Sequence, residues 1–401
     1  MSINKKKITV VLASALVCMA LVFVACQSNN ASGGGSGGNE TIQDGRLLYN
    51  SWPFPVGVAV NARDINPANP QNALIKHFNA IVAENEMKPD SIMTGNYQYG
   101  VYNWDRADAM VNFAEQNGKK IRGHVLFWHS QTPAGFFRGS GTEGRATKDE
   151  LYQRMETLTR DVFARYGNRV YSWDVINEVV DGGSPRNSPY LRIMEDAGLT
   201  GINRYEYVLK AFQFARKYAD LNGGQNVELV LNEYNHESDG DKQNEFLRLL
   251  DYLIANDAPI DGVGLQMHIQ FEWPNLEQVS NAIDKFSAKT RKDGKKLTTV
   301  VTELDITLFN WEETRPGGSR LTVLPNSVRN ERAKMQEDRY VALFNMFERK
   351  FNENKLTGVL IWGTYDGMSW LNSSNVPGRT DYPLLFDRDY KAKPALNRLL
   401  K

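Results

Sequence analysis

Two segments of this 401-residue chain end a run of β-forming residues with a glutamate, and these two glutamates are the side chains best suited to chemistry. Glu178 closes the segment 173–178, and Glu303 follows the valines at 300–301. Hydrolysis of an acetal at neutral pH needs one protonated carboxyl to help the departing oxygen and one ionised carboxylate to attack or stabilise the anomeric carbon. A pair of carboxylates at strand ends therefore predicts glycoside hydrolysis.

The elements that must position this pair alternate between strand and helix from about Glu40 to the end of the chain. The clearest amphipathic helix repeats apolar residues with a 3.6-residue period from Leu151 to Tyr166. Eight apolar segments have the length of strands: 56–60, 80–88, 121–129, 170–178, 227–235, 262–269, 299–306 and 358–366. This alternation over residues 40–401 predicts one catalytic domain of the α/β class, a single (β/α)8 TIM barrel.

A doubly wound open sheet is the structural alternative to the barrel. Such a sheet is expected to carry a glycine-rich phosphate turn after its first strand, whereas residues 61–65 contain no glycine. No second linker, composition break or internal repeat follows residue 40, so no appended binding module is predicted.

Polar and aromatic side chains follow nearly every predicted strand, at the end where a (β/α)8 barrel places its reactive groups. Taken singly, a strand-end carboxylate usually caps a helix or pairs with a base, and a lone histidine is usually structural. Convergence of many such residues on one rim favours a site. The set is Glu84, Asn85, Glu86, Lys88, His124, Trp128, His129, Gln131, Asn177, Glu178, Asn232, Glu233, Tyr234, Asn235, Gln266, His268, Glu303, Asp305, Trp362, Asp366 and Trp370.

The segments around these residues resemble the successive signatures of the glycoside hydrolase family ten xylanases. The resemblance covers about residues 45–400, and its six motifs follow the order of the family. Together they are highly specific, whereas Asn-Glu after a strand is shared by a wider clan of retaining glycosidases. The motifs are NAIVAENEMK at 79–88, GHVLFWHSQTP at 123–133, WDVINE at 173–178, GLQMH at 264–268, TELD at 302–305 and WGTYD at 362–366.

The resemblance implies a role for each catalytic residue. Glu178 would be the acid/base and Glu303 the nucleophile, with Asn177 donating a hydrogen bond to the sugar 2-hydroxyl. His268 and Asp305 would form the network that keeps Glu303 ionised. Glu303 and Asp305 lie two residues apart on a strand, so their side chains are expected to point the same way.

The resemblance also implies a set of sugar-binding residues. Trp362 and Trp370 would wall the cleavage subsite, and Tyr234 would lie toward the leaving group. The non-reducing side of the substrate would be bound by Glu84, Asn85, Lys88, His124, Trp128 and Gln266. The chain departs from the family at Pro89 and at residues 135–137 (Gly-Phe-Phe), where tryptophan is more usual, and both positions belong to the non-reducing side of the cleft in the family.

Composition bounds the partners. Lys and Arg number 47 and Asp and Glu number 47, so no net field attracts a polyanion, and nucleic acid is excluded as an expected partner. No cofactor is expected, because carboxyls supply both the acid and the nucleophile. A metal hydrolase is a second enzyme hypothesis, although no His-x-x-x-His or Glu-x-x-His pair supports it.

The N-terminus has the pattern of a lipoprotein leader. Three lysines precede an apolar stretch, and the sequence Phe23-Val-Ala-Cys26 follows it. Residues 1–25 are predicted to be a signal peptide, Cys26 the lipidated residue and 26–39 a Gly/Ser-rich tether. The expected location is the bacterial cell envelope, on the outer membrane or cell surface. A plain secretory signal and an uncleaved anchor helix remain the alternatives.

The sequence thus predicts a lipid-anchored, monomeric endo-1,4-β-xylanase that acts on xylan and xylo-oligosaccharides with retention of configuration. A family member that prefers β-1,4-glucan or mixed substrates is the nearest alternative. A non-catalytic glycan-binding lipoprotein is the alternative from another class. Such a protein would have no need to keep both glutamates together with His268 and Asp305.

Overall fold

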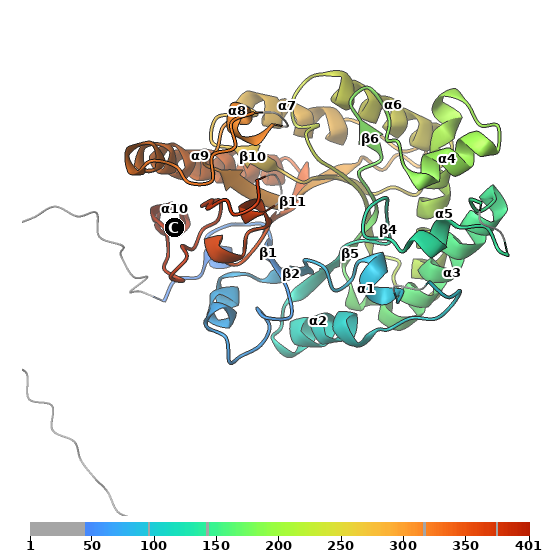
Figure 1. Ribbon diagram of the computed structural model, residues 1–401, viewed down its shortest axis with the longest axis horizontal. Helices are drawn as coiled ribbons and strands as arrows, with labels where there is room; N and C mark the ends of the chain where they lie inside the picture. Colours follow the sequence, from blue (N-terminus) through green and yellow to red (C-terminus); the bar gives the residue numbers. More distant parts are fainter. Residues whose placement is uncertain (1–44, 95–96, 142–143, 316–317, 374–375) are drawn as a thin grey trace, which may run out of the picture. The chain divides into compact units, whose positions relative to one another are not determined.

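The computed structural model describes residues 45–94, 97–141, 144–315, 318–373 and 376–401, and in these ranges eight strand positions close into a parallel barrel (Figure 1). Its order is β1, β2, β3, β5, β8, β9, β11 and β12, and β12 pairs with β1. The short strands β4 and β10 extend the third and sixth positions. The predicted (β/α)8 barrel is confirmed. The barrel strands are β1 (Val56–Val60), β2 (Ala80–Ala83), β3 (Lys120–Gly123), β4 (Phe127–Trp128), β5 (Ser172–Asn177), β8 (Glu228–Glu233), β9 (Gly262–Leu265), β10 (His268–Gln270), β11 (Thr298–Thr307) and β12 (Leu356–Ile361).

Helices surround the barrel and cover its outer face (Figure 1). A small antiparallel hairpin, β6 (Val180–Asp181) with β7 (Ser184–Pro185), follows β5. The helix predicted from the stripe between Leu151 and Tyr166 is α3, which begins with a capping box formed by Thr147 and Glu150. The α-helices are α1 (Pro89–Ile92), α2 (Asp105–Gln116), α3 (Lys148–Tyr166), α4 (Pro189–Asp196), α5 (Glu206–Leu221), α6 (Asp241–Ala255), α7 (Leu276–Ser287), α8 (Trp311–Thr314), α9 (Asn326–Asn352) and α10 (Pro394–Leu399).

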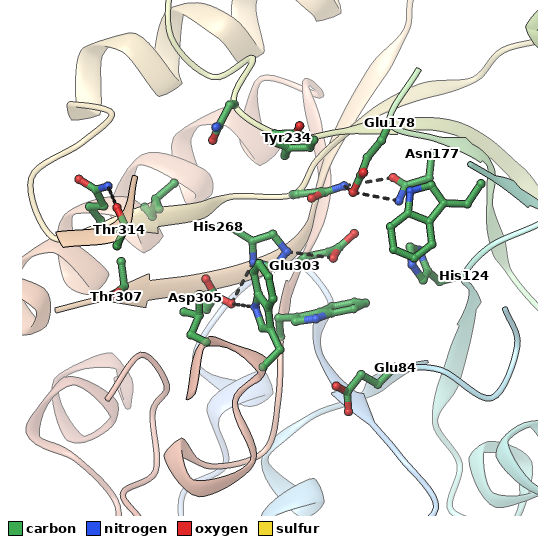
Figure 2. Close-up of a pocket in the computed structure, with 18 of the residues that line it drawn as sticks. Glu84, His124, Asn177, Glu178, Tyr234, His268, Glu303, Asp305, Thr307 and Thr314 are labelled. Atoms are coloured by element: carbon green, nitrogen blue, oxygen red, sulfur yellow. Dashed lines mark hydrogen bonds and ion pairs between the residues drawn. The ribbon is translucent and has the colours of Figure 1, made fainter. Parts of the chain in front are cut away.

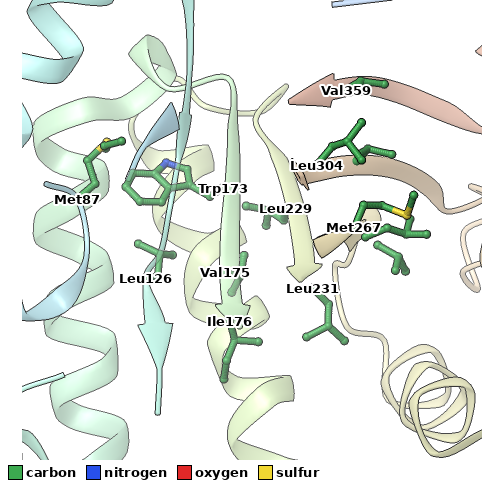
Figure 3. Close-up of a cluster of buried hydrophobic side chains, with 14 of the residues drawn as sticks. Met87, Leu126, Trp173, Val175, Ile176, Leu229, Leu231, Met267, Leu304 and Val359 are labelled. Carbon is green, nitrogen blue, oxygen red and sulfur yellow. The ribbon is translucent and has the colours of Figure 1, made fainter. Parts of the chain in front are cut away.

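The strands are buried on both faces, as parallel strands under a helical layer must be. Side chains that alternate along a strand point to opposite faces. Val230 on β8 therefore joins a small cluster that draws one residue from each of five strands, with Trp362, inside the barrel. Its neighbours Leu229 and Leu231 belong to the larger core between the strands and the helices (Figure 3).

Several predicted strands extend too far at their carboxyl ends. The strand predicted at 80–88 ends at Ala83, the one at 121–129 is interrupted after Gly123, and the one at 358–366 ends at Ile361. The strand predicted at 262–269 breaks at Met267, whose φ of +60° is incompatible with a ladder. The physical reason is shared: at this rim the chain leaves the ladder and turns polar side chains into a cleft.

Two strands carry register shifts, between Asp174 and Ile176 on β5 and between Val301 and Leu304 on β11. Such an irregularity changes which residues face inward. On β11, both Thr302 and the adjacent Glu303 bond to Asn232 inside the barrel, which strict alternation would forbid. The shift on β11 therefore aims Glu303 at the cleft.

The predicted signal peptide, the tether and Cys26 lie outside the described residues. Among the described helices, none combines the length and the hydropathy that a membrane span requires.

Candidate active site

A cleft of about 700 Å³ opens at the carboxyl ends of the barrel strands. The structure brings all fourteen residues that the sequence predicts for catalysis and sugar binding into its lining. They are Glu84, Asn85, Lys88, His124, Trp128, Asn177, Glu178, Tyr234, Gln266, His268, Glu303, Asp305, Trp362 and Trp370.

Glu303 lies at the centre of the cleft floor with its side chain almost fully buried, at 4% exposure (Figure 2). Each of its oxygens has a fixed partner. Asn232 Nδ2 donates to Glu303 Oε1 at 2.7 Å, and His268 Nε2 lies 3.1 Å from Glu303 Oε2. Asn232 is itself oriented, because its Oδ1 accepts a hydrogen bond from the hydroxyl of Thr302 at 2.7 Å.

His268 bridges two carboxylates. Its Nδ1 lies 2.9 Å from Asp305 Oδ2, and its Nε2 faces Glu303. Asp305 Oδ2 also accepts a hydrogen bond from Trp370 Nε1 at 2.8 Å. An imidazole with a carboxylate against each nitrogen is best satisfied as a doubly protonated cation, which donates from both nitrogens. The expectation that Glu303 and Asp305 point the same way is met.

The protonation states of Glu303 and His268 follow from this geometry. Burial alone would raise the pKa of Glu303, but the hydrogen bond from His268, the charge of His124 and the bond from Asn232 together lower it to about 2. Burial lowers the pKa of His268, yet Asp305 and Glu303 outweigh it and raise it to about 10. Glu303 is therefore an ionised carboxylate held against an imidazolium.

Glu178 follows the last residue of β5 and has a backbone φ of +57°. This left-handed conformation costs a non-glycine residue about 1–2 kcal/mol, and the hydrogen bond from Glu178 N to the carbonyl of Asn232 at 3.0 Å helps to hold it. Gln266 Nε2 donates to Glu178 Oε1 at 3.1 Å, and Asn177 Nδ2 approaches the same oxygen at 3.4 Å. The side chain is half-buried at the cleft surface.

Amide side chains connect the two glutamates without a gap. Asn177 Oδ1 accepts from Gln266 Nε2 and from Asn232 Nδ2, both at 3.1 Å. Because Gln266 also bonds Glu178 and Asn232 also bonds Glu303, the four side chains and the amide of Asn177 form one network. Gln266, which the family resemblance assigns to sugar binding, thus contacts Glu178 directly.

The sequence places Asn232 among the rim residues but assigns it no role. The signal that could have assigned one is the Asn-Glu pair at 232–233, which ends β8 just as Asn177 and Glu178 end the β5 segment. The second residue of that pair serves a different purpose here. Glu233 is buried and forms an ion pair with Lys242 at 2.9 Å.

One end of the cleft is lined by strands β2 to β4 and is rich in fixed polar groups. Lys88 Nζ donates to Gln131 Oε1 at 2.8 Å and to Asn85 Oδ1 at 3.1 Å, and lies 5.0 Å from the centre of the Trp128 ring. Burial lowers the pKa of Lys88 and raises the pKa of Glu84.

His124, at the same end, is oriented from inside the barrel. Its Nδ1 lies 2.9 Å from Asp174 Oδ2, and Asp174 forms a buried ion pair with Arg122. The histidine side chain is thereby held with its other nitrogen available to a ligand.

The opposite end of the cleft is lined by residues that follow β8, β10 and β11. Arg186 Nη2 donates to the hydroxyl of Tyr234 at 2.6 Å, and Arg186 Nε donates to the carbonyl of Glu178 at 2.7 Å. Sequence reasoning missed most of this end. Gln270 and Thr307 end β10 and β11 but lie just beyond the predicted strands, and the other residues lie in the loop after β10 or in and beside α8. The missed residues are Gln270, Trp273, Thr307, Trp311, Thr314 and Arg315.

The two departures from the family pattern are largely buried and lie outside the lining of the cleft. Pro89 is buried as the first residue of α1, where its missing N–H needs no partner. Phe136 and Phe137 are buried and pack edge-on against each other, and Phe136 also contacts Tyr97. None of these residues lines the cleft.

Within the described ranges, no cluster of three or more His, Cys, Asp or Glu side chains has the arrangement needed to hold a metal ion. The chemistry available to the described residues is that of carboxyls, amides and imidazole. One ionised, buried carboxylate and one half-buried glutamate face a common cleft, and this arrangement on a (β/α)8 barrel defines a glycoside hydrolase.

The comparisons with known proteins are specific. The chain belongs to glycosyl hydrolase family 10, whose model matches residues 47–401. It is 36% identical over 351 residues to endo-1,4-beta-xylanase C of Paenibacillus barcinonensis, an alignment that covers 85% of this chain and 30% of that protein. It is also 36% identical over 359 residues to the thermostable celloxylanase of Thermoclostridium stercorarium, covering 85% of this chain and 83% of that one.

A solved structure gives the same picture. The intracellular xylanase TsXylA of Thermoanaerobacterium saccharolyticum, determined as a mutant in complex with xylotetraose, superposes with a TM-score of 0.72 at 33% identity. The match covers 89% of this chain and 98% of that structure. The resemblance stated from the six motifs is confirmed.

Proposed function

We propose that this chain is an endo-1,4-β-xylanase that hydrolyses internal xylan linkages with retention of configuration. The observation that carries the proposal is the ionised Glu303, held by His268 and joined through Asn232 and Asn177 to Glu178 in one cleft. The xylanase relatives and the relative bound to xylotetraose support xylan as the substrate.

The first step cleaves the glycosidic bond. Glu178, in its protonated form, gives its proton to the departing glycosidic oxygen as the bond from that oxygen to the anomeric carbon breaks. Glu303 attacks the anomeric carbon from the opposite face and forms a glycosyl ester. The cation of His268 keeps Glu303 ionised before the attack and receives no proton in this step.

The second step releases the sugar. Glu178, now a carboxylate, takes a proton from water as the water oxygen bonds to the anomeric carbon, and the ester bond to Glu303 breaks. Glu178 and Glu303 are then restored to their starting states. Two inversions at the same carbon leave the product with the β-configuration of the substrate.

The remaining cleft residues would bind the polymer. Asn177 would donate to the 2-hydroxyl of the sugar that is cleaved, and Trp362 and Trp370 would wall its subsite. Tyr234 would contact the leaving group. The non-reducing side would be bound by Glu84, Asn85, Lys88, His124 and Trp128.

Activity on β-1,4-glucan is the second candidate function, favoured by the similarity to a celloxylanase. Chromatography of the products from unsubstituted xylan and from β-1,4-glucan separates the two. The proposal expects a ladder of xylo-oligosaccharides at early times from xylan. Release of a single small product would show exo action, and hydrolysis of glucan alone would overturn the xylanase proposal.

We also propose that Cys26 is acylated and tethers the domain to the cell envelope. The cysteine follows an apolar leader and precedes a flexible Gly/Ser segment rather than core sequence. Stable anchoring needs more than one acyl chain, which a multiply acylated terminus supplies. The native protein should fractionate with membranes and Cys26→Ser should not. A membrane-bound Cys26→Ser protein would show that residues 8–25 act as an uncleaved anchor.

A further inference from the structure

The loop after β11 places an exposed tryptophan in the cleft. Trp311 is 58% exposed although it lines the same cleft as Glu303, together with the half-buried Trp273 from the loop after β10. A tryptophan that packed into the core would lose nearly all of its exposure. The indole of Trp311 therefore contributes little to folding and keeps most of its apolar surface available to a ligand.

The backbone that carries Trp311 is firmly held. Trp311 is the first residue of α8, whose capping box consists of Asn310 and Glu313. Arg332 Nη1 donates to Glu313 Oε2 at 2.6 Å and to the carbonyl of Leu308 at 2.9 Å. A short helix held by a half-buried ion pair at its base presents its tryptophan on a fixed platform.

Two further contacts tie this platform to the barrel. The guanidinium of Arg379 lies 4.1 Å from the centre of the Phe309 ring and donates to the carbonyl of Glu313. Gln270 Nε2 donates to Thr314 Oγ1 at 3.3 Å, which joins the end of β10 to the end of α8. The α8 segment is thus connected by hydrogen bonds to the strand that carries His268.

The platform lies at the leaving-group end of the cleft. Figure 2 shows Thr314 and Thr307 on one side of the catalytic centre and His124 on the other, with His268, Glu303 and Glu178 between them. The His124 end would bind the non-reducing side of the substrate in the proposed function. The sugars that leave after cleavage would therefore extend past Tyr234 toward α8.

We propose that Trp311, together with Trp273, forms a distal subsite that stacks the pyranose rings of the leaving β-1,4-xylan chain. The inference rests on the proposed function and adds the residues that select long substrates. A xylopyranose ring carries no hydroxymethyl group, so it presents flat C–H faces that indole rings contact well. Binding there would steer cleavage to internal bonds, since a chain occupies the platform only when several sugars follow the cleaved one.

The test compares a long substrate with a short one that has the same cleaved sugar. Xylohexaose can reach the platform, whereas the nitrophenol of p-nitrophenyl β-xylobioside ends beside Glu178. Trp311→Ala should lower kcat/KM for xylohexaose roughly five- to twentyfold, the size expected when a stacked aromatic contact is lost. With the aryl xylobioside it should change kcat/KM by less than about twofold. Trp311→Phe should recover most of the loss.

Cleavage positions give a readout that a folding defect would not move. With xylohexaose labelled by ¹⁸O at its reducing end, Trp311→Ala should shift cleavage toward the labelled end, because the leaving-group side no longer holds the chain. Leu221→Ala, at a 70% exposed residue on α5, is the matched control and should leave both rates and the pattern unchanged.

The outcomes separate the inference from the proposed function. A wild-type protein that cleaves xylohexaose while Trp311→Ala leaves both the rate and the pattern unaltered would overturn the inference alone. Equal losses on both substrates would overturn it as well, since Trp311 would then act on the catalytic centre. A wild-type protein that cleaves neither substrate would overturn the proposed function itself.

Discussion

The catalytic centre and the leaving-group end of the cleft are built in different ways. At the centre, strand-end residues are buried and every polar atom of Glu303 has a partner. At the leaving-group end, loop residues present aromatic surface, and Trp311 stays largely exposed. The centre is organised by hydrogen bonds and charge, whereas the loop end is organised by apolar area.

This difference separates chemistry from substrate selection. Buried polar contacts at the centre set the protonation and direction of the reacting groups, so their loss should affect every substrate. Aromatic contacts at the loop end reach only chains that are long enough to cross it. Changes at the centre should therefore lower rates whatever the length of the chain, and changes at the loop end should discriminate by chain length.

The largest expected effect comes from removing the nucleophile. Glu303→Ala should lose at least roughly three to four orders of magnitude in kcat on short and long substrates alike, because the covalent route disappears. Val300, Val301 and Leu304 carry the packing of this part of β11, so the variant should still fold and unfold cooperatively. Near-wild-type hydrolysis by a folded Glu303→Ala protein would show that Glu303 is not the nucleophile.

Removal of the acid/base should depend on the leaving group rather than on chain length. Glu178→Ala should be most damaging for xylan and much milder for activated aryl xylobiosides, whose leaving groups need no proton. Added azide should restore turnover and yield a β-glycosyl azide. A loss of equal size for all leaving groups, with no rescue by azide, would contradict the acid/base role of Glu178.

The imidazolium makes a prediction about pH. The pKa of Glu303 is lowered from an ordinary 4.5 to about 2, with burial opposed by the hydrogen bond and charge of His268. His268→Gln removes that charge, so the pKa should rise toward 4.5 or above. Because the nucleophile must be ionised, the acidic limb of kcat/KM should move to higher pH. Asn85→Ala, which changes the polar end of the cleft, should lower kcat/KM without moving the limb.

Glu303 and His268 also make the stability of the protein depend on pH. The lowered pKa of Glu303 contributes stability that is fully present above about pH 4.5 and is lost as the pH falls toward 2. The raised pKa of His268 contributes stability that is fully present below about pH 6.5 and is lost as the pH rises toward 10. The difference in unfolding free energy between wild type and His268→Gln should therefore be greatest between about pH 4.5 and 6.5. A difference that kept growing above pH 7 would contradict the imidazolium.

The smallest expected effect lies at the loop end. Thr314→Ala removes the hydroxyl that accepts from Gln270, a bond whose loss is worth about 1 kcal/mol or less. It should lower kcat/KM for xylohexaose by less than about fivefold and leave the aryl xylobioside unaffected. A larger loss on the short substrate would show that the leaving-group end does not act independently of the catalytic centre.

Sequence patterns predicted the centre well, because its residues follow strands whose order determines where they meet. The spacing of Glu303 and Asp305 predicted their shared direction, and the Asn-Glu ending predicted the place of Glu178. The bond from Asn232 to Glu303 could not be predicted in the same way. It depends on the register shift in β11, which no periodicity in the sequence reveals.

The loop end was beyond sequence reasoning for a related reason. The Asn310–Glu313 capping box predicts that a helix begins there, but a four-residue helix could lie anywhere near the rim. Its position is set by Arg332 and Arg379, which are distant in the chain and contact it only in the folded protein.

Covalent trapping tests the central claim most directly. A 2-deoxy-2-fluoro-β-xylobioside with a dinitrophenyl leaving group should inactivate the enzyme. The fluorine slows both formation and release of the glycosyl ester, and the activated leaving group speeds only its formation, so the ester accumulates. Mass spectrometry of the digested protein should place one 2-deoxy-2-fluoroxylobiosyl group on Glu303 and none on Glu178. A label on any other residue, or inactivation that leaves no covalent sugar, would contradict Glu303 as the nucleophile.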